Sequence, residues 1–491
     1  MRTLLGFGAV TIAASLLMGV HHTHAATTES ILHVFNGTDG HSPSGALVQD
    51  AAGNLYGITG RGGTISTACP AFPTVNGSTF PDGCGLVFKL APPASGKTAW
   101  TETILYKFSG HDGSSPVGDL IFDKAGNLYG TTTTGGDVGP ACPGSKTAGT
   151  YAGCGLVFQL APPRPGKPGW TQTILYRFTN ADGSQPSAGL AIDAAGHLYG
   201  TASSGGGTNT ACPINKKNGV PPGCGVAFEL TPPKPGKSAW TYDVLHQFTS
   251  GPDGNDPLAK LVFDSAGNLY GTTAAGGLTP ASCAADTSTG VPAGCGTVFK
   301  LKPPAAGKTE WAEILLHRFT GAAGGANPIG SLVLDKDGNL YGTTYLGGTS
   351  PSGPLGTVFK LAPPAAGQAV WPLTILHDFG NGTGSVQDGA YPYAGLLITP
   401  AGLLVGTTSE GGNESLGAVF KLTPPAAGKT VWSEAILYSF ALGADPDGYA
   451  PYGGLIRDAA GNLYGTTLAA ALPGNGGEGK TGDGVVFKIA P

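Results

Sequence analysis

The strongest constraint on the fold is a short phrase that recurs seven times along the 491-residue chain. The phrase reads Ile-Leu-Tyr-x-Phe with some variation, and successive copies lie 60 to 73 residues apart. Self-similarity at such a period is typical of repeat architectures, in which each unit buries its apolar face against its neighbours. The Phe that ends the phrase falls at Phe35, Phe108, Phe178, Phe248, Phe319, Phe379 and Phe440.

The repeat also explains an unusual composition. The chain contains 84 Gly and 40 Pro, a load that without a period would indicate low-complexity sequence. Because 40% of the residues are hydrophobic, the chain can bury a large core. The net charge of −5 disfavours nucleic acid and anionic membranes as main partners.

Each repeat carries four short strand signals, which in the second repeat lie at 120–123, 127–132, 155–160 and 170–178. Short strands bounded by Gly, Pro, Asn and Asp are typical of all-β proteins, and we find no amphipathic helix after the leader. Four strands per unit and seven units predict an all-β fold, namely a seven-bladed β-propeller with four-stranded blades.

The two ends of the chain predict how the ring closes. Residues 31–35 correspond to a fourth strand without its first three, and residues 485–489 to a third strand without its fourth. We therefore expect the N-terminal strand to complete the last blade, which leaves the ring without an open edge. An open solenoid is the alternative, and the complementary ends disfavour it. Six tryptophans open the fourth strands, and the seventh is absent where ring closure interrupts the hairpin.

Residues 1–25 have the features of a secretory signal peptide. Arg2 is followed by an apolar stretch from Leu4 to Val20, and small residues precede an expected cleavage after Ala25. Residues 26–491 then form one propeller domain that is secreted or periplasmic. A transmembrane anchor is the alternative, but about 17 apolar residues are short for a span. No later stretch suggests one, so we expect no membrane anchor.

The eight cysteines fall as one pair in each of four successive repeats, which predicts one local disulfide per repeat and agrees with export. Metal binding is the alternative, but the pairs are 12 to 15 residues apart, without CxxC spacing or a regularly placed His. We therefore predict disulfides, no metal and no cofactor. The expected pairs are Cys69 with Cys84, Cys142 with Cys154, Cys212 with Cys224, and Cys283 with Cys295.

Two phrases of the repeat resemble a known family. They are Asp-x-x-Gly-Asn-Leu-Tyr-Gly-Thr-Thr, as at 264–273, and Gly-x-Val-Phe-Lys-Leu, as at 356–361. Both resemble the bacterial Gloeo-Verruco tandem repeat, a family of exported proteins of unknown function, over residues 31–490. The sixth repeat departs from the pattern with Thr399, Leu403 and Val405. The resemblance implies propeller-like repeats and export, and it implies no reaction.

Variable loops and unevenly placed tyrosines point to one face of the ring. The connections between blades and the loops between second and third strands share this face, and these loops are longer in repeats one to four than in the rest. We expect a one-sided wall beside a groove, unless the bridges merely protect long loops from proteolysis. Tyr391, Tyr393, Tyr449 and Tyr452 should gather on the low side near the central mouth. Tyrosine suits sugars and peptides, although packing between blades is the alternative.

Repeated aspartates are better explained by turns than by a metal. An Asp-Gly turn precedes six repeats, and its carboxylate commonly bonds to nearby backbone, although a ring of carboxylates could also attract a cation. The six residues are Asp39, Asp112, Asp182, Asp253, Asp388 and Asp447.

We find no catalytic constellation. Four histidines (His33, His246, His317 and His377) occupy the slot that holds Tyr in other repeats, which favours a half-buried structural position. His41 and His111 have no partner evident from the sequence, and the pairs Glu410/Glu414 and Glu478/Asp483 are best explained as solvated loop charge.

The predicted function is that of an exported, non-catalytic binding or interaction scaffold for a glycan or an extracellular protein. Tyr391, Tyr393, Tyr449 and Tyr452 are the candidate contacts. The alternatives are a secreted propeller enzyme, either a lyase or a glycosidase, and a purely structural envelope protein, because a propeller fold by itself selects none of them.

Overall fold

A computed structural model describes most of the repeat region. The described residues are 28–63, 69, 72–73, 79–80, 83–137, 142, 152–207, 212, 223–284, 293–305, 307–351, 353–380, 388–441, 447–471 and 481–491. The expected signal peptide and most of each long loop between second and third strands lie outside these residues.

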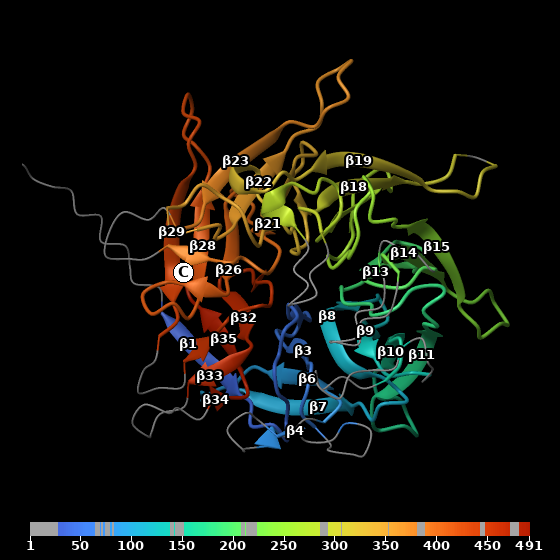
Figure 1. The fold of residues 1–491 in the computed structure, drawn as a ribbon. Coiled ribbons are helices and arrows are strands. Elements are labelled where there is room, and N and C mark those ends of the chain that lie inside the picture. Colours follow the sequence, from blue (N-terminus) through green and yellow to red (C-terminus); the bar gives the residue numbers. More distant parts are fainter. Residues whose placement is uncertain are drawn as a thin grey trace, which may run out of the picture.

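The chain forms seven four-stranded antiparallel sheets arranged as a ring, so the predicted seven-bladed propeller is confirmed (Figure 1). Blade 1 contains β2 (Val48–Gln49), β3 (Leu55–Thr59), β6 (Leu86–Ala91) and β7 (Thr101–Lys107). Blade 2 contains β8 (Ser114–Phe122), β9 (Leu128–Thr134), β10 (Leu156–Ala161) and β11 (Thr171–Arg177). Blade 3 contains β12 (Ala191–Ile192), β13 (Leu198–Ala202), β14 (Val226–Thr231) and β15 (Thr241–Gln247).

The other four blades have the same order of strands. Blade 4 contains β16 (Val262–Phe263), β17 (Leu269–Thr273), β18 (Thr297–Lys302) and β19 (Ala312–Arg318). Blade 5 contains β20 (Val333–Leu334), β21 (Leu340–Thr344), β22 (Thr357–Leu361) and β23 (Leu373–Asp378). Blade 6 contains β25 (Leu397–Ile398), β26 (Leu404–Thr408), β28 (Ala418–Thr423) and β29 (Ser433–Ser439). Blade 7 contains β31 (Ile456–Arg457), β32 (Leu463–Thr467), β35 (Val485–Ile489) and β1 (Glu29–Val34).

Short additional strands pair with one another at the ends of some blades. They comprise β4 (Phe72–Pro73) with β5 (Thr79–Phe80), β24 (Gly389–Ala390) with β27 (Glu410–Gly411), and the set β30 (Gly448–Tyr449), β33 (Ala469–Ala471) and β34 (Thr481–Gly482). Within the described residues the helical segments are two single 3-10 turns, η1 (Ala281–Cys283) and η2 (Ala322–Gly324). No described helix has the length and apolar character needed to cross a membrane.

The ring closes as predicted, through the first strand of the chain. β1 pairs antiparallel with β35, with Glu29 opposite Ile489 and Val34 opposite Val485. Figure 1 shows the blue β1 alongside the red β35. Because both ends of the chain belong to one blade, this pairing removes the open edge that a linear array would expose.

The repeated phenylalanines hold neighbouring blades together. In each of the seven junctions the Phe of the recurring phrase meets the Phe of the next blade's third strand, edge to face, with ring centroids 5.1–5.3 Å apart. The second strand passes directly over this pair at a glycine. A Cβ on Gly200 would lie 2.6 Å from Phe228 Cζ, so a side chain at this position would displace the core.

The tryptophans explain why the sixth repeat departs from the pattern. Each Trp packs against the second-strand Tyr of the preceding blade, with centroids 6.1–6.4 Å apart, in all six cases. Blade 7 has no Trp, because its fourth strand is the N-terminal β1, and the position that such a Trp would face in blade 6 is Val405. Blade 7 therefore lacks the Trp, and blade 6 lacks the Tyr, of the same contact between blades.

The Asp-x-x-Gly-Asn segment is confirmed as a turn in which the Asp carboxylate accepts hydrogen bonds from the backbone. Asp123 Oδ1 accepts hydrogen bonds from the N–H groups of Ala125 and Asn127, and its Oδ2 accepts from the Asn127 amide and from the Tyr129 hydroxyl. These bonds hold the pKa of Asp123 below its usual value, although burial acts in the opposite direction. The same set recurs at Asp50, Asp264, Asp335 and Asp458.

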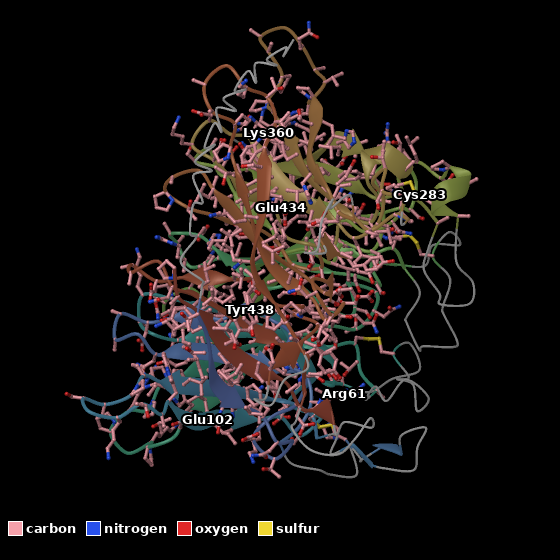
Figure 2. All side chains as sticks on the ribbon, turned by 90° about the vertical axis from the view of Figure 1, so that its left-hand side faces the viewer. Arg61, Glu102, Cys283, Lys360, Glu434 and Tyr438 are labelled. Atoms are coloured by element: carbon pink, nitrogen blue, oxygen red, sulfur yellow. A yellow bond between two sulfur atoms is a disulfide. The ribbon has the colours of Figure 1, made fainter. Side chains whose placement is uncertain are left out.

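All four predicted disulfides form within their own repeats. The bonded pairs are Cys69 with Cys84, Cys142 with Cys154, Cys212 with Cys224, and Cys283 with Cys295. Figure 2 shows the yellow sulfur bonds along one side of the molecule, as expected if the loops between second and third strands share a face. Four disulfides are typical of proteins that fold in an oxidising extracellular or periplasmic compartment.

Candidate ligand-binding site at a tyrosine cluster

A strained residue lies at or before the start of the first strand in every blade, at the mouth of the ring. It lies directly before a proline and has a left-handed backbone, with φ between 52° and 57° in all seven blades. Non-glycine residues rarely adopt this region, so the surrounding structure must enforce it. At Tyr391, for example, the N–H donates to the Leu355 carbonyl, and the Tyr391 carbonyl accepts from Ser409 N–H. The seven residues are Ser42, Ser115, Gln185, Asp256, Asn327, Tyr391 and Ala450.

Three of the four predicted tyrosines lie in one aromatic cluster around this position. Tyr393, two residues after Tyr391, stacks on Tyr452 of blade 7 with ring centroids 4.7 Å apart and planes 21° apart. A fourth ring, Tyr345, follows β21 and lies 5.2 Å from Tyr391 and 6.1 Å from Tyr393. Tyr393 keeps 41% of its surface exposed, so its ring is open to a ligand.

The fourth candidate, Tyr449, is placed differently. It belongs to β30 and pairs with Ala469 of β33, and within the described residues it has no ring contact with the other three candidates. The structure thus brings Tyr391, Tyr393 and Tyr452 together and leaves Tyr449 outside the cluster.

Two acidic residues border the tyrosine cluster. Burial raises the pKa of Tyr345, and the nearby Tyr452 and Glu410 raise it further. The pKa of Tyr393 is raised first by burial and then by Tyr452 and Asp256. Burial also raises the pKa of Asp256 itself to about 7. The cluster therefore combines flat apolar rings and phenol hydroxyls, and Glu410 and Asp256 act on it electrostatically.

Polar contacts also join blades across the middle of the ring. Asp119 of blade 2 lies 3.9 Å from the Lys260 ammonium of blade 4 and accepts a hydrogen bond from Ala46 N–H of blade 1. Lys260 N–H in turn donates to Ser331 Oγ of blade 5. An ion pair therefore joins blades 2 and 4, which are not neighbours in the ring.

Sequence reasoning missed Tyr345 and Asp256, although each carried a signal. Tyr345 follows the Thr-Thr pair that ends the second strand, and the matching residue in the other six blades is never aromatic. Asp256 is the one charged residue among the seven that precede the first-strand proline. Both are single departures from an otherwise regular repeat. The expected wall of long loops in blades 1 to 4 lies largely outside the described residues.

His41, which had no partner in the sequence, has two in the structure. Its Nδ1 is hydrogen-bonded to the Ser42 hydroxyl, and its Nε2 lies 3.4 Å from Asp483 Oδ1. Burial and the nearby Arg61 lower the pKa of His41 to about 4, so the imidazole is neutral at pH ~7. Burial, followed by the charge of Asp39, raises the pKa of Asp483 to about 6.

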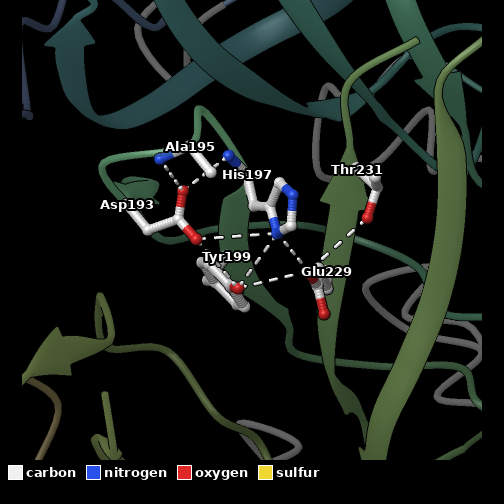
Figure 3. A network of polar contacts seen from close by, with 6 residues as sticks. All are labelled: Asp193, Ala195, His197, Tyr199, Glu229 and Thr231. Atoms are coloured by element: carbon white, nitrogen blue, oxygen red, sulfur yellow. Dashed lines mark hydrogen bonds and ion pairs between the residues drawn. The ribbon is translucent and has the colours of Figure 1, made fainter. Parts of the chain in front are cut away.

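The short-turn face carries one further polar network, in blade 3 (Figure 3). His197 replaces the turn Asn, and its Nδ1 lies 2.8 Å from Glu229 Oε1 and 3.5 Å from Asp193 Oδ2. Tyr199 OH also lies 3.1 Å from Glu229. In other blades the position of Glu229 holds Lys or Gln, and three such lysines lie 5.3–5.8 Å over the equivalent Tyr ring. Blade 3 therefore has a contact between His197 and Glu229 where three other blades have a Lys over the Tyr ring.

The fold defines the chain as a seven-bladed β-propeller with a tyrosine cluster at the mouth of its ring. The sequence model of the Gloeobacter/Verrucomicrobia repeat matches residues 19–211, 71–282 and 285–478. The chain belongs to this family, as the recurring phrases predicted. No protein with a curated description matches the chain.

Solved structures with a similar fold share little sequence with the chain. A protein of unknown function from Dyadobacter fermentans is 11% identical, covers 94% of this chain and 98% of its own, and gives a TM-score of 0.41. Selenomethionine-substituted virginiamycin B lyase from Staphylococcus aureus is 12% identical, covers 94% and 100%, and gives 0.49. A catalytically inactive variant of that lyase with quinupristin is 11% identical, covers 95% and 99%, and gives 0.47. We transfer no residue role from these structures.

Proposed function

We propose that this protein is an exported, non-catalytic binding module that recognises a glycan through the tyrosine cluster at the mouth of its ring. The carrying observation is the stacked pair of Tyr393 and Tyr452, of which Tyr393 keeps 41% of its surface exposed. Aromatic faces suit the C–H-rich faces of sugar rings, and neighbouring carboxylates accept hydrogen bonds from sugar hydroxyls. An extracellular protein loop is the second ligand class that this chemistry suits.

Export is the second part of the proposal. Four disulfides in a chain of this size favour an oxidising compartment, either the periplasm or the extracellular space. The N-terminal apolar stretch supplies the route. Mass spectrometry of the secreted protein tests this part, with an N-terminus at position 26 as the expected result.

A glycan array tests the site with variants that the chain itself suggests. The residues equivalent to Tyr393 and Tyr452 in blades 1 and 3 are Ser44 and Ser187, so the double variant Tyr393→Ser/Tyr452→Ser should fold. We expect it to lose binding, because each stacked aromatic ring contributes roughly 1 kcal/mol beyond its buried area. Tyr449→Ala is the matched control and should bind as the wild type does.

The outcomes separate the ligand classes. Glycan binding that survives the double variant refutes the proposed site. If no glycan binds, a protein ligand or a structural role in the envelope takes its place.

One observation favours an enzyme as the second candidate. Asp256, whose pKa burial raises to about 7, and Glu410 both act electrostatically on the cluster, and glycosidases use two carboxyl groups of which one has a raised pKa. Asp256→Asn distinguishes the two functions. A binding module keeps its ligand in this variant, whereas a glycosidase or lyase loses turnover of the ligand that the array identifies.

A further inference from the structure

A polar cluster of three residues links the outer strands of neighbouring blades. Its first member is the His or Tyr two residues before the repeated Phe, and its second is the Asp of the following Asp-Gly turn. The third comes from the next blade, four residues before the His or Tyr of that blade. Three clusters are of the His–Asp–Glu type, namely His33–Asp39–Glu102, His246–Asp253–Glu313 and His377–Asp388–Glu434.

The third residue of the cluster varies with the identity of the first two. Wherever a His faces an Asp in this slot, the third residue is Glu. In blade 4 His317 has Ala323 in place of the Asp, and the third position is then Leu373. The two acids are therefore replaced together in blade 4, although the same pair of acids also accompanies a tyrosine, in Tyr438–Asp447–Glu29.

Two of the three Tyr clusters are held by hydrogen bonds, whereas the His clusters leave buried atoms unsatisfied, as Glu29 Oε1 does in the cluster of Tyr438. Tyr106 OH lies 2.6 Å from Asp112 Oδ2 and 2.9 Å from Gln172 Oε1. By contrast, Oε1 of Glu102 and Oε1 of Glu434 are buried and have no hydrogen-bond partner. His33 Nε2 is also buried, and it too makes no hydrogen bond. Buried polar atoms without partners are rare and require an explanation.

The positions of the ligand atoms fit a metal ion. In two of the clusters one nitrogen and two carboxylate oxygens all lie within 4.8 Å of one another. His377 Nε2 is 3.1 Å from Asp388 Oδ2, and His33 Nε2 is 3.5 Å from Asp39 Oδ2. Ligand atoms at ~2.1 Å from a common ion are themselves about 3.0–3.4 Å apart in octahedral or tetrahedral coordination. The cluster of His246 does not bring its three atoms within the same limit.

We propose that the protein holds two divalent transition-metal ions, one at His33–Asp39–Glu102 and one at His377–Asp388–Glu434. One imidazole and two carboxylates form a mixed nitrogen and oxygen set that suits Zn²⁺ or Mn²⁺ better than Ca²⁺, with water as the remaining ligands. Figure 2 labels Glu102 and Glu434, the third member of each cluster. The first site ties β1 of blade 7 to β7 of blade 1, and the second ties blade 5 to blade 6. The proposal does not depend on the tyrosine cluster.

Isothermal titration with Zn²⁺ tests the two sites on the untagged chain after removal of metal by a chelator, with the disulfides intact. We expect two ions per chain, one ion in His377→Tyr, and none in His33→Tyr/His377→Tyr. Tyr is the residue that blades 1, 2 and 6 use in this slot, so these variants should fold. His317→Tyr is the matched control and should still bind two ions, because its slot lacks both acids.

Thermal unfolding separates loss of metal from loss of fold. We expect Zn²⁺ to raise the unfolding temperature of the wild type but not of the double variant, while the two metal-free proteins unfold alike. Two-ion binding that persists in the double variant, or a wild-type chain that binds no Zn²⁺, overturns the proposal. Equal affinity for Ca²⁺ overturns the assignment of a transition metal.

Discussion

Glu29, on the strand that closes the ring, should destabilise the protein at neutral pH. Tyr438 OH donates to Asp447 Oδ2 at 3.0 Å and lies 3.5 Å from Glu29 Oε2, while Glu29 Oε1 is buried without a partner. Burial, followed by the charge of Asp447, raises the pKa of Glu29 from 4.5 to about 8. The folded chain therefore holds the proton of this carboxyl group more tightly than the unfolded chain does.

The sign of the pH dependence follows from this difference. Below pH ~4.5 both states are protonated, and Glu29 does not alter the free energy of unfolding. As the pH rises towards about 8 the unfolded chain ionises first, so stability falls across this window. At pH ~7 the raised pKa of Glu29 corresponds to a loss of about 3 kcal/mol in the free energy of unfolding. Glu29 is only partly buried, and solvent screening reduces the expected effect to roughly 1–2 kcal/mol.

Glu29→Gln removes the titration and has a precedent within the chain. Gln172 occupies the equivalent position in blade 2, where its amide donates to the Asp112 carbonyl at 2.7 Å. We expect wild type and variant to unfold at the same temperature at pH ~4.5, and the variant to be the more stable at pH ~7.5. Calorimetry at both pH values measures this, with the exposed Glu310→Gln as control. A variant that is destabilised equally at both pH values would refute the reasoning.

Two further predictions concern the scaffold. Removal of one bridge by Cys142→Ala/Cys154→Ala should lower stability by about 3 kcal/mol in the loop-entropy description, and denaturant unfolding of variant and wild type, both with their other bridges oxidised, measures the loss. If the variant retains the wild-type unfolding temperature, the bridge does not restrict the unfolded chain. Gly200→Ala should destabilise blade 3 by about 1–3 kcal/mol, because its Cβ meets Phe228, whereas Gly169→Ala has open space and should have little effect. Equal unfolding temperatures for these two variants would contradict the packing argument.

The repeat made the architecture predictable. Strand count, blade count and ring closure all follow from a period whose first and last units are complementary, and the disulfides follow from cysteines at matching places in four repeats. In the second repeat the predicted strand at 127–132 corresponds to β9 (Leu128–Thr134), and the predicted 170–178 to β11 (Thr171–Arg177). The predicted first strand at 120–123 lies at the end of the longer β8 (Ser114–Phe122), whereas the first strands of the other blades are two residues long.

Contacts between blades were the part that the sequence did not disclose. Glu102 lies 69 positions beyond His33, so no local spacing marks the polar cluster, and the pairing becomes evident only when consecutive repeats are known to be neighbours in a ring. Tyr345 was missed for the same reason. It follows a second strand in blade 5, whereas its partner Tyr391 precedes a first strand in blade 6.

The regularity of the ring helps to decide whether the tyrosines only pack between blades or form a binding site. The seven residues before the first-strand proline share one backbone conformation, yet they include Ser42, Gln185 and Ala450 beside Tyr391. The scaffold therefore forms without an aromatic ring at this position, in contrast to the phenylalanine pairs, which are present at all seven junctions because the core requires them. Because the backbone does not need a large ring at this position, we propose that Tyr391 serves in binding rather than in filling space.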